Sequence, residues 1–99
     1  MQFHWDNGNT EHIARHAITP QEAEQVVEND PFDAGVVLRN GETRTPHLGE
    51  TDAGRVLVVI VTERDGMYRV VTARPADRKE RAFYSNHKAA ANDQDPTDP

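Results

Sequence analysis

One run of apolar residues, 56–61, constrains the fold more than any other part of the chain. The run is continuously aliphatic and mostly β-branched, which is typical of a central strand covered on both faces. Arg64, Asp65 and Gly66 follow as a turn signal, and a second strand is predicted at 68–73. We therefore expect a hairpin of these two strands to form the core of a sheet.

Two further strands are predicted before this hairpin, at 36–39 and 42–48. They flank Asn40-Gly41, a dipeptide that strongly favours a tight turn between paired strands. Pro46 lies in the second of them, and proline cannot donate a ladder hydrogen bond, so we expect an edge strand there.

The clearest helix signal begins at Thr19. Threonine is a good N-cap, Pro20 suits the first helical position, and Glu22 stands where a capping box needs a glutamate. A helix is predicted from there to Glu28. A shorter helix is predicted at 7–16.

Asp6 can cap that first helix, and a third helix is predicted at 76–87, where Pro75 ends the last strand. The order of elements predicts an α+β fold. We expect an antiparallel sheet of about four strands, two N-terminal helices and one C-terminal helix, with the helices packed on one side of the sheet.

The length of 99 residues, of which 35% are hydrophobic, supports one modest core. We expect a single domain at 1–88 and a disordered acidic tail at 89–99, which lacks aromatic and large aliphatic residues. Cysteine is absent, and we find neither a signal stretch nor an apolar run near the roughly 18 residues of a membrane span. A cytoplasmic protein without membrane contacts is therefore expected.

The formal net charge of −6 argues against a nucleic-acid partner, because lysine and arginine contacts to phosphate dominate such binding. The charge is unevenly distributed, however. Residues 55–88 hold 8 basic and 4 acidic residues, whereas 1–54 hold 3 basic and 10 acidic ones. Since charges act over about one Debye length, roughly 8 Å in physiological salt, a local basic segment can still recognise an anion.

A series of short motifs resembles the BrnT family of ribonuclease toxins in order and spacing. They are Phe3-His4-Trp5-Asp6, Arg15-His16, Thr19-Pro20-Gln21-Glu22-Ala23, Asp30-Pro31, Gly41-Glu42-Thr43-Arg44, Gly54-Arg55, Thr62-Glu63-Arg64, and Ala73-Arg74 followed by Glu80-Arg81 and Tyr84. The resemblance implies a RelE-like fold and a type II toxin that cleaves RNA without a metal or cofactor. It also implies a cognate BrnA-like antitoxin as partner, with DNA contacted only indirectly through that antitoxin.

Metal-free RNA cleavage needs a base for the 2′-hydroxyl, cations for the phosphate and an acid for the leaving oxygen. Arg74 and Arg81 match family positions near the last strand and helix, and Tyr84 follows on nearly the same helix face. His16 occupies the histidine position of a family motif. The candidate catalytic residues are therefore His16, Glu42, Arg44, Arg74, Arg81 and Tyr84, and the candidate RNA contacts are Arg55, Arg64 and Arg78.

Other readings stay open at this point. His12 and His16, four residues apart, could share a metal on one helix face, together with His4 and His47. A non-catalytic interaction domain that keeps the toxin fold is the main alternative. The aromatic side chains are assigned to the core rather than to base stacking, because so small a domain needs their bulk: Phe3, Trp5, Phe32 and Phe83.

Overall fold

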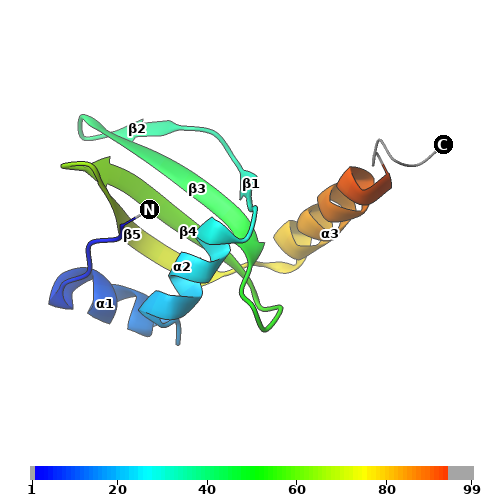
Figure 1. Ribbon diagram of the computed structural model, residues 1–99, viewed down its shortest axis with the longest axis horizontal. Helices are drawn as coiled ribbons and strands as arrows, with labels where there is room; N and C mark the ends of the chain where they lie inside the picture. Colours follow the sequence, from blue (N-terminus) through cyan, green and yellow to red (C-terminus); the bar gives the residue numbers. More distant parts are fainter. Residues whose placement is uncertain (1, 94–99) are drawn as a thin grey trace.

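The computed structural model describes residues 2–93, which form three helices and five strands (Figure 1). In chain order these are α1 (Asn7–Ala14), α2 (Pro20–Glu28), β1 (Phe32–Asp33), β2 (Val37–Arg39), β3 (Glu42–Glu50), β4 (Val56–Arg64), β5 (Met67–Pro75) and α3 (Arg78–Asp93). The strands form one antiparallel sheet in the order β1-β3-β4-β5, and β2 also pairs with β3. The predicted α+β class and antiparallel sheet are confirmed.

The sheet has five strands rather than about four, because β1 was not predicted. This strand contains only Phe32 and Asp33, which pair with Leu48 and His47 of β3. Two residues are too few to show an alternating pattern in the sequence. The other strands were predicted at the correct places, although each long strand extends two or three residues further than expected. The expectation that Pro46 lies in an edge strand is wrong, because β3 pairs with β4 on one side and with β1 and β2 on the other.

The strand β4 is central, as its apolar run predicted. Leu57, Val59 and Val61 point to the face covered by α1 and α2, which supply Ile13, Ala23 and Val26 among others to the same buried cluster. Val58 points to the opposite face, where it packs with Leu48, Ala76 and Tyr84. Successive side chains of a strand alternate between faces, so β4 carries two separate clusters.

Both N-terminal helices begin at the predicted caps. The Asp6 side chain accepts a hydrogen bond from the backbone N–H of Asn9, and Thr19 accepts one from Glu22. Each cap is a reciprocal capping box that satisfies N–H groups left without partners by the first helical turn. The helix α1 ends at Ala14 instead of residue 16, because the chain turns at Ala17 with a φ of 57°.

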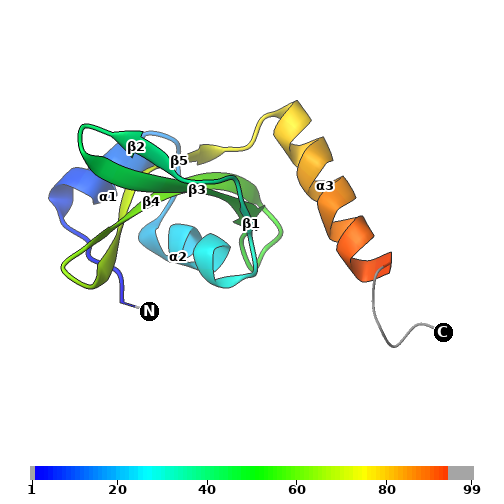
Figure 2. The same ribbon diagram turned by 90° about the horizontal axis from the view of Figure 1, so that it is seen from above.

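The helix α3 corrects the expectation that all helices lie on one side of the sheet. Ala76, just before it, and Tyr84 within it pack against Leu48 and Val58, on the face opposite α1 and α2. Most of α3 extends beyond the end of the sheet (Figure 2). It continues to Asp93, so 89–93 of the expected tail are helical, and 94–99 lie outside the described residues.

The strand β2 is unusually apolar for its position at the sheet edge. Val36, just before it, and Val37 and Leu38 within it are 66%, 52% and 70% exposed.

Among residues 2–93, no helix has the length and apolar character needed to cross a membrane.

Thr19→Ala should lower the free energy of unfolding by about 1 kcal/mol, because it removes the acceptor that caps α2. Gln21→Ala is a matched control on an exposed position of the same helical turn and should change stability by less than about 0.5 kcal/mol. Urea unfolding followed by circular dichroism measures both. Equal stabilities of the two variants would contradict the role of the cap.

Candidate active site on the distal sheet face

The sheet face away from α1 and α2, here called the distal face, carries polar side chains at one end and apolar ones at the other. Thr62 of β4 is paired with Arg69 of β5. Pro46 of β3 is paired with Ile60 of β4, and Arg44, two residues before Pro46, falls on the same face of the sheet. Along β4 toward its start, the next positions on this face are Ile60 and Val58. In the other direction, Arg64 follows at the end of β4. The polar end is therefore formed by arginines from three different strands, Arg44, Arg64 and Arg69.

A hollow of about 340 Å³ lies at this polar end. We call it the arginine hollow, and define it by Arg44, Arg64, Arg69, His12 and Glu42, which all line it. Three guanidinium groups around one hollow provide the planar donors that suit phosphate oxygens.

Glu42 links two of these arginines. Its Oε2 lies 2.5 Å from Nη2 of Arg64, and its Oε1 lies 3.3 Å from Nε of Arg44. The hydrogen bond from Arg64, followed by that from Arg44, lowers the pKa of the Glu42 carboxyl below its usual value. A carboxylate stabilised in this way is a weak base. Glu42 is thus better suited to aligning the two guanidinium groups than to accepting a proton.

Arg69 connects the hollow to the start of α1. Its Nη1 and Nη2 donate to Oδ2 and Oδ1 of Asp6 at 2.9 and 3.3 Å, and Nη1 also lies 3.1 Å from Nδ1 of His4. The hydrogen bond from Arg69, with the Asn9 N–H, lowers the pKa of Asp6 to about 2. The same carboxylate therefore caps a helix and orients an arginine.

His12 reaches the hollow from α1, which packs along β5. Its Nε2 lies 3.0 Å from Oγ1 of Thr72. Thr72 is paired with Ile60, so this contact places the imidazole at the distal face. Imidazole is the side-chain type that changes charge near neutral pH, so it can accept or donate a proton in a reaction.

The predicted candidate His16 lies elsewhere. It is exposed in the turn after α1, where its backbone carbonyl accepts from Nη2 of Arg55 at 3.2 Å. Arg55 also donates to the Ala17 carbonyl at 2.7 Å and pairs with Glu22. Arg55 therefore fastens the α1–α2 connection. Because α1 ends before His16, the expected shared helix face with His12 is absent, and residues 2–93 contain no cluster of three metal-ligating side chains.

Arg74, Arg81 and Tyr84 lie at the other end of the distal face. Arg74 forms two hydrogen bonds with the Glu80 carboxylate, at 2.7 and 2.8 Å, and Arg81 donates to the Ala76 carbonyl. Tyr84 is 6% exposed, and burial, with Glu50 nearby, raises the pKa of its phenol.

Arg74 is paired with Val58, four residues along β4 from Thr62, a separation of about 13 Å. The structure thus brings together Glu42, Arg44 and Arg64, whereas Arg74 and Arg81 form a separate group, and Arg78 is exposed at the start of α3.

Sequence reasoning left Arg69 and His12 out of the candidate catalytic set. Arg69 and Thr72 share the distal face only because the pairing with β4 shifts by one residue after Ile60, which leaves Val71 as a bulge. Strict alternation would have placed them on opposite faces. The motif Phe3-His4-Trp5-Asp6 was the better signal, because Asp6 and His4 within it both contact Arg69.

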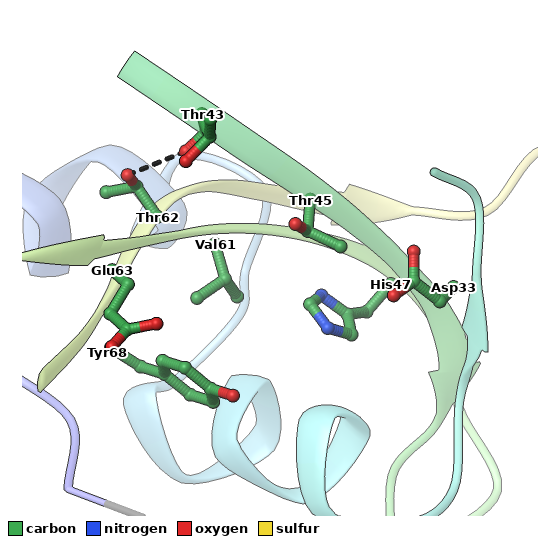
Figure 3. Close-up of a pocket in the computed structure, with 8 residues that line it drawn as sticks. All are labelled: Asp33, Thr43, Thr45, His47, Val61, Thr62, Glu63 and Tyr68. Carbon is green, nitrogen blue, oxygen red and sulfur yellow. Dashed lines mark hydrogen bonds between the residues drawn. The ribbon is translucent and has the colours of Figure 1, made fainter. Parts of the chain in front are cut away.

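A second pocket, of about 180 Å³, opens on the other face of the sheet. Figure 3 shows the His47 ring and the Tyr68 phenol lining it, with Glu63 beside Tyr68. The Nδ1 atom of His47 is buried, and within the described residues it has no hydrogen-bond partner. The pocket is separated from the arginine hollow by the sheet, so the histidines considered for a metal site, His47 and His12, do not meet.

Asp6→Asn should remove a pH-dependent part of the stability. Because the pKa of Asp6 is depressed from 3.8 to about 2 in the folded chain, its contribution is complete above about pH 4 and is lost as the pH falls toward about 2. Urea unfolding at stepped pH values should show a smaller acid-induced loss of stability in the variant. Glu11→Gln, an exposed carboxylate of the same helix, is the control. An identical acid profile in wild type and Asp6→Asn would contradict the assignment.

The family comparison covers most of the chain. A family described as the ribonuclease toxin, BrnT, of type II toxin-antitoxin systems matches residues 5–80. The matched range contains every residue that defines the arginine hollow and also Arg74, but it ends before Arg81. No curated protein matches the chain. The chain belongs to the BrnT family of type II toxin-antitoxin ribonuclease toxins.

Proposed function

We propose that the chain is a metal-independent endoribonuclease that cleaves RNA at the arginine hollow and thereby arrests translation. The observation that carries the proposal is the convergence of Arg44, Arg64, Arg69 and His12 on one hollow. The order of helices and strands further leads us to propose that the fold is RelE-like.

The reaction follows from the side chains present. His12 accepts the proton of the 2′-hydroxyl as its oxygen attacks phosphorus, and the bond from phosphorus to the 5′ oxygen breaks. The leaving oxygen takes a proton from water, the hydroxide that remains takes the proton held by His12, and a 2′,3′-cyclic phosphate and a 5′-hydroxyl result. The negative charge that grows on the phosphate is stabilised by Arg44, Arg64 and Arg69.

Metal independence is proposed from the chemistry of the donors. Divalent ions that assist phosphoryl chemistry are held mainly by carboxylates, and the only carboxylate lining the arginine hollow in the described chain is Glu42. That carboxylate is already bound to Arg44 and Arg64. The three guanidinium groups supply the positive charge that a metal would otherwise bring.

The remaining predicted residues take supporting parts in this proposal. Arg74, Arg81 and Arg78 contact the RNA backbone away from the cleaved bond, and Tyr84 holds α3 on the sheet. The catalytic role predicted for His16 passes to His12, and Arg55 stabilises the fold. Arg64 moves from an RNA contact to the reacting phosphate.

We propose that the toxin acts in the cytoplasm and that a BrnA-like antitoxin neutralises it by covering the distal face. DNA would then be contacted through the antitoxin alone. The non-catalytic alternative, an interaction domain that keeps this fold, draws on the net charge of −6. It also draws on Glu42 and Asp6, which partly neutralise the arginines of the hollow.

Expression of the chain alone should arrest growth of a bacterial host, because its RNA is cleaved, and co-expression of the cognate antitoxin should restore growth. Optical density and an immunoblot for soluble protein measure the outcome. Normal growth at verified soluble expression would favour the non-catalytic alternative. Arg44→Ala, expressed at the same level, is the control and should permit growth.

Purified Arg44→Ala should cleave RNA about a hundredfold more slowly than wild type, because a charge-stabilising donor at the phosphate is lost. His12→Gln should be affected similarly, whereas wild-type cleavage should persist in excess chelator. Arg74→Ala combined with Arg81→Ala is the matched comparison: it removes two cations from the far end of the face. If only this double variant abolishes cleavage, the reaction takes place at the junction of the sheet and α3. Loss of wild-type activity in chelator would contradict metal independence.

A further inference from the structure

We propose that the apolar end of the distal face binds an unpaired nucleobase of the same single-stranded RNA whose phosphate enters the arginine hollow. This inference rests on the proposed function. The site is a groove of about 640 Å³ between α3 and the sheet. We call it the base groove; its lining is Phe32, Ala34, Pro46, Leu48, Val58, Ile60, Phe83 and the side chains of Arg74, Lys79 and Glu80.

The aromatic side chains of the groove are arranged for stacking. Phe83 is 47% exposed, which corrects its assignment to the core. Its ring meets Phe32 edge to face, with centroids 4.9 Å apart, and lies nearly parallel to the ring of His87, at an interplanar angle of 8°. Phe32 therefore fixes the orientation of Phe83. A partly exposed aromatic face that neighbours hold in place is the platform on which proteins stack unpaired bases.

The groove and the arginine hollow belong to one continuous surface. Thr62, Ile60 and Val58 follow one another along a single face of β4. Thr62 is paired with Arg69 of the arginine hollow, and Val58 lines the base groove. Thr62 and Val58 are thus about 13 Å apart along the strand. A single RNA strand can place a phosphate in the hollow and a base a few nucleotides away in the groove without leaving this face.

The charges at the groove favour nucleic acid over an apolar peptide. Arg74 and Lys79 both line the groove, and the Arg74 side chain is oriented by its two hydrogen bonds to Glu80. One acidic and two basic side chains leave a positive balance beside the aromatic platform. Aromatic faces combined with cations that follow the backbone are the usual composition of sites for single-stranded nucleic acid.

The test uses RNA whose 2′-hydroxyls are methylated, because such RNA cannot be cleaved by attack of the 2′ oxygen and binding is then separated from catalysis. Phe83→Leu keeps the apolar contact with Phe32 but removes the aromatic face, and it should weaken binding about tenfold. Phe83→Trp should retain wild-type affinity. Leu38→Ala, at a still more exposed apolar position on β2, is the control and should bind as wild type. Fluorescence anisotropy gives the dissociation constants, and circular dichroism verifies that α3 remains folded.

Oligonucleotide length provides a second readout. The difference between wild type and Phe83→Leu should be absent for the shortest RNA and appear once the strand is long enough to span from hollow to groove. Equal affinity of wild type and Phe83→Leu at every length would overturn the base groove while leaving cleavage at the hollow intact. Loss of antitoxin affinity with unchanged RNA affinity would assign the groove to a protein segment instead. A wild-type protein that binds no RNA would overturn both proposals.

Discussion

The rest of the structure depends on the burial of β4 from both sides. Leu57, Val59 and Val61 require a cover on one face, and α1 and α2 provide it. Val58 lies under Ala76 and Tyr84 on the other face, but α3 covers only one end there. In a chain of this size, two helices are available to cover one face of the sheet, and only part of a third helix covers the other face. The distal face is therefore left accessible over much of its length, and the polar residues near the β4–β5 turn line a hollow instead of a core.

Stability and the proposed function share residues at this hollow. Asp6 caps α1 and also binds Arg69 in two places, so the helix that carries His12 is fixed to the strand that carries Arg69. Glu42 has a similar part between Arg44 and Arg64. These carboxylates hold the arginines in place, and in the proposed reaction an incoming phosphate competes with them for the same donors.

Most of the secondary structure could be predicted from local chemistry. The capping residues Asp6 and Thr19, the Asn40-Gly41 turn and the aliphatic run of β4 each act within a few residues, so their effects are visible in the sequence. The site was less accessible, because it depends on relations between distant residues. Glu42, Arg44 and Arg64 were named, yet their convergence requires the register of β3 against β4. Arg69 and His12 depend on the bulge at Val71 and on the docking of α1, and neither feature has a local signal. The side on which α3 packs was also hidden, since Phe83 and Tyr84 fit an apolar cluster on either face.

The exposed edge at β2 affects how the chain behaves before it meets a partner. Val37 and Leu38 present apolar surface beside the outward N–H and C=O groups that any edge strand offers to an extended peptide. Arg39, the last residue of the strand, is one of few charges nearby that oppose such pairing. Pairing through such an edge needs two chains, so its extent rises with the concentration of the protein. The level of synthesis then bears on two surfaces of the chain: the arginine hollow of the proposed reaction, and the apolar edge that β2 leaves open.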